Sequence, residues 1–150
     1  MMKIACLILF VLAQLSAPHV SYAKVIQRCH MCGMDAAKSQ TEFVVYLSDE
    51  STQHTCCMHC VYLLEKFIVP LKVVKMETRD FATGMLIDAS KAYYLEASSL
   101  MPKGSMAPFL LAFLEEQAVQ KFKKKYKGNI LTFKEAMEAV ARFDAEVSSK

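Results

Sequence analysis

The chain has 150 residues, of which 54% are apolar and 22% charged, and its formal net charge is +3. This length accommodates one domain with a sizeable hydrophobic core, and the weak positive charge excludes the strongly basic surface of a protein that binds nucleic acid or an anionic membrane. Six cysteines and ten methionines make sulfur the unusual part of the composition.

Residues 1–23 have the layout of a cleavable secretory signal. Lys3 precedes an apolar run over residues 4–15, and Ser21-Tyr22-Ala23 places small residues at the first and third positions of a cleavage site. The run is shorter than the about 20 apolar residues that span a membrane. Cys6 lies too early in this run to be the modified cysteine of a lipoprotein. We therefore expect a periplasmic or secreted protein that begins near Lys24 and has no transmembrane segment.

Two short segments after the signal concentrate soft metal ligands. They read Cys29-His30-Met31-Cys32-Gly33-Met34 and Cys56-Cys57-Met58-His59-Cys60. Thiolates and thioethers select Cu(I), zinc and related ions, whereas calcium and magnesium require oxygen ligands. Five cysteines remain once residues 1–23 are removed, and this odd number leaves at least one thiol unpaired in a monomer. None of the five lies beyond residue 60. This clustering predicts a site rather than a disulfide framework.

The first half of the chain predicts two strands, a helix and a third strand. Residues 41–47 are rich in β-branched and aromatic side chains, and a polar turn separates them from residues 52–55, so we expect a hairpin. Apolar residues then recur at helical spacing from Cys57 until Pro70 stops them. The helix would carry the second cysteine cluster in its first turn, and residues 71–76 would form the next strand.

The second half repeats this order. We expect a strand over residues 84–87, a turn, a returning strand over residues 92–97, and a long helix from about Met106 to Tyr126. Gly33-Met34 and Gly84-Met85 take matching places in the two halves. A duplication and a chance recurrence of two strands and a helix both agree with this pattern.

The C-terminal part predicts the end of the long helix and one more. Gly128-Asn129 ends the long helix, residues 130–133 form a short strand or link, and Thr132 with Glu135 resembles the capping box of a last helix that runs to about Val147. The five lysines between residues 121 and 127 fit a solvated helix end better than a partner site, because cations complement the dipole there.

The fold class that follows is α+β. We expect one domain over residues 24–150, made of two small strand-strand-helix units at about 27–76 and 77–147. Each unit would have an antiparallel sheet with helices packed on one face. The first unit would contain a metal knuckle similar to that of treble-clef domains.

The cysteine spacing suits one tetrahedral ion. In a treble-clef or ribbon zinc site, a tight knuckle such as Cys29-x-x-Cys32 supplies two ligands and the first turn of a helix supplies two more. Cys56 and Cys60 are one helical turn apart, so both sulfurs would reach an ion about 2.3 Å away. Cys57 with Cys60 would serve nearly as well, and Cys57 could instead pair in a disulfide, so the fourth ligand stays open.

The other donors favour an exchangeable ion over a purely structural one. Methionine binds zinc poorly but Cu(I) well, and spare donors beside a site allow an ion to pass to a partner by ligand exchange. His30 and His59 are ligands, proton acceptors or surface residues, whereas His54 lies in a predicted strand and is structural. Met101 and Met106 form another soft pair. The candidate metal ligands are Cys29, Cys32, Met34, Cys56, Cys57, Cys60 and Met106.

These residues resemble a known family. The segment at residues 29–34, with Gly104-Ser105-Met106-Ala107-Pro108-Phe109 and Ala112-Phe113, is similar to the NosL family of nitrous-oxide-reductase accessory proteins over about residues 27–140. The resemblance implies a Cu(I)-binding envelope protein that supplies copper to a multicopper enzyme and is built from two related strand-strand-helix units. It also implies that Cys32 and Met106 bind copper. The second cysteine cluster resembles metal-trafficking modules of the TRASH type.

These residues are compatible with three functions. The leading hypothesis is a non-enzymatic Cu(I) chaperone whose partner is a client metalloenzyme or copper transporter of the cell envelope. The alternative is a structural Zn(II) domain that acts as a protein-binding module. The third is thiol-disulfide chemistry at Cys29 and Cys32, which is disfavoured because Gly33 does not open a helix. An unpaired thiol or a shared ion could also join two chains in a homodimer.

Overall fold

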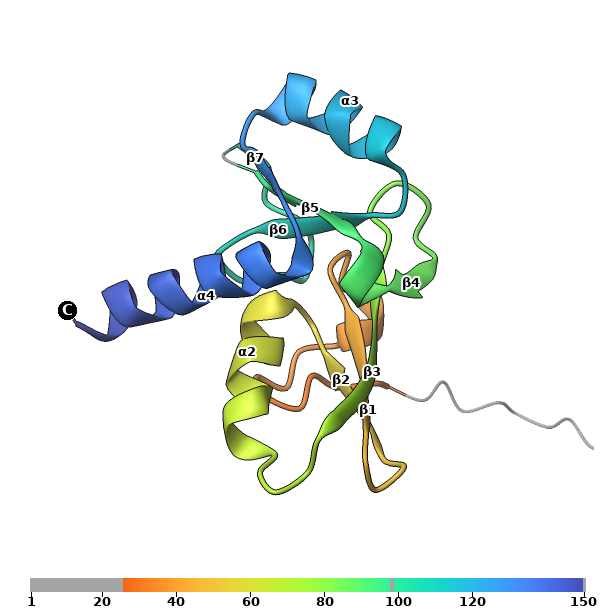
Figure 1. Cartoon of the computed structure of the whole chain (residues 1–150), viewed down its shortest axis with the longest axis vertical. Helices are drawn as coiled ribbons and strands as arrows, with labels where there is room; N and C mark the ends of the chain where they lie inside the picture. The colour runs from red at the N-terminus through yellow and green to blue at the C-terminus, as the bar shows by residue number, and fades with distance from the viewer. Residues whose placement is uncertain (1–25, 98, 150) are drawn as a thin grey trace, which may run out of the picture.

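A computed structural model describes residues 26–97 and 99–149 (Figure 1). The predicted signal at residues 1–23 and the predicted start at Lys24 lie outside this part of the chain. In the two described ranges, no helix is both long enough and apolar enough to cross a membrane. The fold is α+β with two antiparallel sheets, as the sequence predicts.

The first sheet forms from the predicted hairpin and the strand after the first helix. Its strands are β1 (Phe43–Leu47), β2 (Thr52–Thr55), β3 (Val73–Arg79) and β4 (Leu86–Asp88), in the spatial order β2-β1-β3-β4. Helix α2 (Met58–Phe67) connects β2 to β3. The hairpin and the helix are confirmed, and the third strand begins two residues later than the predicted range and ends three residues later.

The second sheet has three strands in the order β6-β5-β7. They are β5 (Tyr93–Glu96), β6 (Leu110–Phe113) and β7 (Asn129–Leu131), and α3 (Glu116–Tyr126) connects the last two. Both sheets thus contain the same β-β-α-β path, in which the first strand lies between the second and the third. The last helix, α4 (Phe133–Ser148), follows β7.

The prediction of one helix over residues 106–126 is wrong in its first half. Residues 110–113 form β6, and every one of them is buried. A short continuous apolar run fits a doubly covered strand and a buried helix equally well, so its periodicity could not separate them. Leu111 and Phe113 face α3, whereas Leu110 and Ala112 face the core that contains α4. The prediction of helices on one face of each sheet is therefore wrong for this sheet.

The predicted pairing of residues 84–87 with residues 92–97 is also wrong. Strand β4 pairs with β3, whereas β5 pairs with β6 and β7. Between them, the Asp88 side chain accepts a hydrogen bond from the backbone N–H of Ser90 and caps a short 3-10 helix, η2 (Ala89–Lys91). This cap redirects the chain into the second sheet.

A hydrophobic core joins the two sheets. It combines β1 and α2 side chains with Tyr94, Ala136 and Val140 of the second half. Figure 1 shows α4 below the second sheet and above α2, and α4 contacts α2, β5 and β7. The predicted capping box is present, because the Thr132 hydroxyl accepts from the Glu135 N–H while the Glu135 carboxylate accepts from the Thr132 N–H.

Candidate metal centre

The first cysteine pair lies on a tight turn before β1. The Cys29 N–H donates to the carbonyl of Met34 (2.6 Å) and the Gly33 N–H donates to the carbonyl of Cys29 (2.9 Å). Gly33 has φ +76°, a left-handed conformation that glycine adopts without strain. The His30 N–H donates to the carbonyl of His54 on β2 (2.8 Å). This bond anchors the turn beside the strand that leads to the second cysteine cluster.

The second cluster occupies the junction between β2 and α2. Cys57 is the N-cap of the helix in an extended conformation, and Cys60 lies in the first turn. Cys56 precedes the helix, so the expectation that it shares a helical face with Cys60 is wrong. The two sulfurs still lie 3.6 Å apart, because the extended junction turns the Cys56 side chain toward the helix.

Two buried hydroxyls hold Cys56 in place. The hydroxyls of Ser39 and Thr41 donate to the Cys56 carbonyl at 2.6 and 2.9 Å, and both residues are buried. Such bonds fix a backbone position, since a buried carbonyl without donors costs about 1–3 kcal/mol. Sequence reasoning missed these residues because no local pattern connects them to a cysteine about 15 positions away.

Four thiols converge on one point. The Sγ atoms of Cys29, Cys32, Cys56 and Cys60 all lie within 4.8 Å of one another. Cys56 Sγ is 3.5 Å from Cys32 Sγ and 3.6 Å from Cys60 Sγ. Sulfurs that bind one tetrahedral ion with bonds of about 2.3 Å are roughly 3.8 Å apart. The spacing of the thiols therefore fits a single metal ion.

Burial distinguishes these thiols. Cys29 is 2% exposed, and Cys56 and Cys60 are fully buried, whereas Cys32 is exposed. All five described cysteines are free thiols. An ion bound by the four sulfurs would therefore be enclosed by three of them and open to solvent at Cys32.

Hydrogen bonds among the buried thiols lower the pKa of some and raise the pKa of others. Hydrogen bonds from the Cys56 and Cys60 thiols, supported by backbone N–H donors, hold the pKa of Cys29 well below its usual range despite burial. Hydrogen bonds to Cys29 and to other thiols, together with burial, raise the pKa of Cys60. Bonds from Cys56 and Cys60 lower the pKa of Cys57 to about 3. A bound cation replaces the shared protons, since metal ligands must be deprotonated.

Three thioethers surround the thiols. Met31, Met34 and Met106 pack against the buried cysteines. Met106 arrives there on the loop between β5 and β6, which docks through paired hydrogen bonds between Gln40 and Lys103 (3.0 and 2.7 Å). Met106 does not take the place that the Cys56–Cys57 junction has in the first half, because the corresponding junction of the second half, residues 114–115, lies after β6. Met101 is 77% exposed and is not packed against the cluster.

The histidines have other partners. His30 is exposed. His54 Nδ1 is 3.1 Å from the carboxylate of Glu42, which supports its structural interpretation. His59 Nδ1 donates to the carbonyl of Ala107 (2.9 Å), so it fastens the loop of Met106 to α2. In the described part of the chain, the group of converging ligand atoms contains thiols and no histidine.

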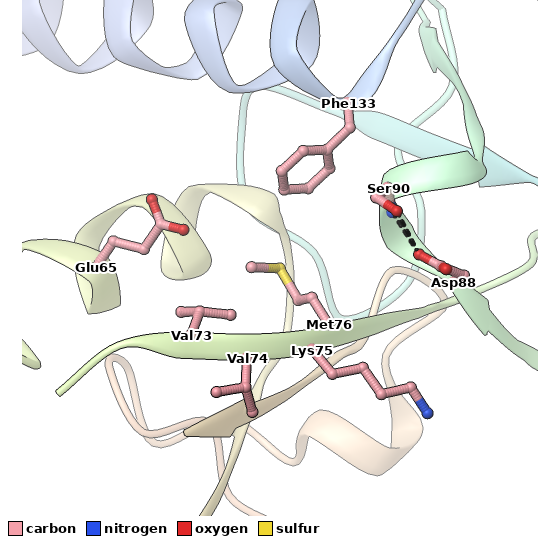
Figure 2. A pocket seen from close by; sticks show the side chains of 8 residues that line it. All are labelled: Glu65, Val73, Val74, Lys75, Met76, Asp88, Ser90 and Phe133. Carbon is pink, nitrogen blue, oxygen red and sulfur yellow. Dashed lines mark hydrogen bonds between the residues drawn. The ribbon is translucent and has the colours of Figure 1, made fainter. Parts of the chain in front are cut away.

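A groove of about 350 Å³ lies elsewhere on the molecule and shares no residue with the cysteine cluster. Figure 2 shows Glu65, Met76 and Phe133 around it, with Lys75 on the other side of β3. Burial raises the pKa of Glu65. Lys75 is already paired with Glu77 at 2.8 Å. The groove offers scattered polar groups, whereas the cysteine cluster offers converging ligands.

Comparison with known proteins supports the fold. No family model matches the chain, and no curated protein matches it. The crystal structure of the copper chaperone NosL from Shewanella denitrificans is similar, with a TM-score of 0.61 and 18% sequence identity. The match covers 75% of this chain and 93% of that chain. This likeness shows that the two proteins share a fold.

Proposed function

We propose that this protein is an accessory metal chaperone of the cell envelope that carries Cu(I) and delivers it to a client metalloenzyme or copper transporter. The observation that carries the proposal is the set of four sulfurs within 4.8 Å, of which three are buried and one is exposed. Thiolates select soft ions such as Cu(I) and zinc, and the thioethers of Met31, Met34 and Met106 beside them favour Cu(I). The solved copper chaperone that has the same fold supports this choice.

The exposed thiol of Cys32 is the ligand at which Cu(I) transfer to a client can begin. A donor group of the client replaces Cys32 while the buried Cys29, Cys56 and Cys60 still hold the ion. The client next displaces the buried ligands, and each released thiolate takes up a proton from solvent. Cu(I) passes between proteins without becoming free, and Met31, Met34 and Met106 supply soft donors along the way.

The fold does not depend on the ion under this proposal. The core between the sheets and the cluster beneath α3 are built from aliphatic and aromatic side chains. A chain of this size buries enough apolar surface to fold on such cores. Release of the cargo therefore leaves the protein folded and ready to bind again.

A structural zinc ion is the second candidate, because the sulfur spacings of 3.5 and 3.6 Å are close to those of a tetrahedral thiolate site. In that case the ion would hold the turn at residues 29–34 against α2, and a chelator would unfold the protein. Circular dichroism during chelation separates the candidates. Retained ellipticity supports the chaperone, and cooperative loss supports structural zinc.

Copper titration tests the proposal directly. Reduced protein is titrated with Cu(I) under anaerobic conditions against a chromophoric chelator. We expect tight binding that weakens at least tenfold in Cys32→Ser, because a hydroxyl is a poor ligand for Cu(I). Met101→Leu is the matched control for an exposed sulfur outside the cluster and should bind as the unmodified protein does. Equal affinity in Cys32→Ser and the unmodified protein would refute the assignment.

A further inference from the structure

Cys56 occupies the centre of the thiol cluster. Its Sγ lies 3.5 Å from Cys32 Sγ, 3.6 Å from Cys60 Sγ and 3.8 Å from Cys57 Sγ. A sulfur with neighbours on several sides is placed to bridge two ions, because a thiolate has more than one lone pair to donate. In a mononuclear tetrahedral site a sulfur has only its three fellow ligands at such distances, whereas Cys56 also has Cys57, which is not one of the four converging thiols.

Cys57 is the thiol that a four-ligand site leaves over. It is 1% exposed and belongs to the same buried cluster, yet it is not among the four sulfurs that converge within 4.8 Å. The Cys60 thiol and the backbone N–H of Met106 lie beside its sulfur. Cys56, Cys57 and Cys60 thus form a second triangle of sulfurs on the side that faces the Met106 loop.

Charge points the same way. One Cu(I) ion adds a single positive charge, whereas four thiolates carry four negative charges in a cluster with three buried members. Like charges in a buried site repel strongly. A second monovalent ion offsets the charge of a fifth thiolate, so Cys57 takes part in binding without any increase in the net negative charge of the cluster.

We propose that the cluster carries two Cu(I) ions that share the Cys56 thiolate. Cys29, Cys32 and Cys56 bind the first ion, and Cys56, Cys57 and Cys60 bind the second, with the Met106 thioether packed beside it. Trigonal sites with metal–sulfur bonds of about 2.3 Å separate their sulfurs by roughly 4.0 Å, which is close to the observed spacings. The inference rests on the proposed function and specifies the size of its cargo.

Native mass spectrometry of the reduced protein tests the stoichiometry. Cu(I) is supplied anaerobically from a chelator complex that removes weakly bound ions. The unmodified protein should retain two Cu(I) ions, whereas Cys57→Ser and Cys57→Ala should retain one. Zn(II) needs only the four converging thiols, so all three proteins should retain one Zn(II). X-ray absorption should show a copper neighbour around copper in the unmodified protein and none in the variants.

The outcomes separate this inference from the proposed function. Saturation of the unmodified protein at one Cu(I), or retention of two by Cys57→Ser, would overturn the two-ion cluster and leave a chaperone for one ion. Loss of Zn(II) by both Cys57 variants would assign Cys57 to the first ion and would also overturn it. Failure of the unmodified protein to bind Cu(I) tightly would refute the proposed function itself.

Discussion

The turn that carries Cys29 and the turn that carries Asp80 have the same backbone hydrogen bonds. Cys29 N–H donates to Met34 and Asp80 N–H donates to the carbonyl of Met85, at 2.6 and 2.7 Å. Each turn also has a glycine five positions after an arginine whose guanidinium donates to that glycine's carbonyl. The matching places of Gly33-Met34 and Gly84-Met85 in the sequence thus correspond to matching turns.

The likeness extends to the strand beside each turn. His30 N–H donates to the carbonyl of His54 on β2, and Phe81 N–H donates to the carbonyl of Ala112 on β6, both at 2.8 Å. Two residues separate strand from helix in each half, Cys56-Cys57 in the first and Leu114-Glu115 in the second. Cys60 in the first turn of α2 then corresponds to Ala118 in α3.

The difference is the group that fills the turn. The Asp80 carboxylate accepts from the N–H groups of Thr83 (2.9 Å) and Leu114 (3.0 Å) and from the Thr83 hydroxyl (2.6 Å). In the first half, the Cys29 sulfur faces the corresponding N–H groups of Cys32 and Cys56. One scaffold thus directs two backbone N–H groups at an acidic side chain at the same place twice. A carboxylate closes the turn with hydrogen bonds, whereas a thiolate with three more thiols around it makes a metal site.

Removal of the carboxylate should have the largest effect on stability. Asp80→Ala removes a buried carboxylate and leaves the part-buried N–H groups of Thr83 and Leu114 without their acceptor. Each orphaned group costs about 1–3 kcal/mol, so we expect a loss of about 3 kcal/mol in the free energy of unfolding by urea denaturation. Asp80→Asn keeps an acceptor and should lose less. A loss below about 1 kcal/mol in Asp80→Ala would contradict the structural role.

Replacement of a helical thiol should break metal binding in the first half only. Cys60→Ser removes a buried ligand, and we expect Cu(I) affinity to fall about a hundredfold, which is about 2.7 kcal/mol. Ala118→Ser makes the matched change at the corresponding position of α3 and should leave the affinity unchanged. Competition with a chelator measures the Cu(I) affinity of both variants. Equal losses of affinity in the two would mean that metal binding is not confined to the first half.

Loss of a hydroxyl that supports Cys56 should have a smaller effect. Thr41→Val keeps the side-chain volume but removes one of the two donors to the Cys56 carbonyl. We expect a loss of about 1 kcal/mol in stability and a weaker Cu(I) complex, because Cys56 becomes less well positioned. Ser99→Ala removes an exposed hydroxyl that donates to the carbonyl of Tyr126 in the second half. This control should leave Cu(I) affinity as it was.

The smallest expected effect has the opposite sign. Thr55 is the last residue of β2 and corresponds to Phe113, the last residue of β6. The buried hydroxyl of Thr55 has no hydrogen-bond partner among the described residues. Thr55→Val replaces that hydroxyl by a methyl group of similar size. We expect the free energy of unfolding to rise by up to about 1 kcal/mol. A clear decrease would show that the hydroxyl has a partner, such as a buried water molecule.

Local patterns were enough for the parts of the molecule in which neighbours along the chain decide the structure. The β1–β2 hairpin, α2 and the Thr132–Glu135 capping box depend on turn residues, periodicity and capping groups a few positions apart. The convergence of Cys29 and Cys32 with Cys56 and Cys60 was also predictable, since a knuckle and a helix start with this spacing form metal sites repeatedly.

Contacts between distant segments settled the rest. Residues 110–113 form a strand that is buried on both faces, because helices cover both sides of the second sheet. The Asp88 cap directs the chain after β4 into the second sheet, so β4 pairs with β3 and not with β5. Met106 reached the thiols through the Gln40–Lys103 contacts, and Ser39 and Thr41 reached Cys56 across a buried space. Packing and burial act between side chains regardless of their separation along the chain, so no window of sequence contains them.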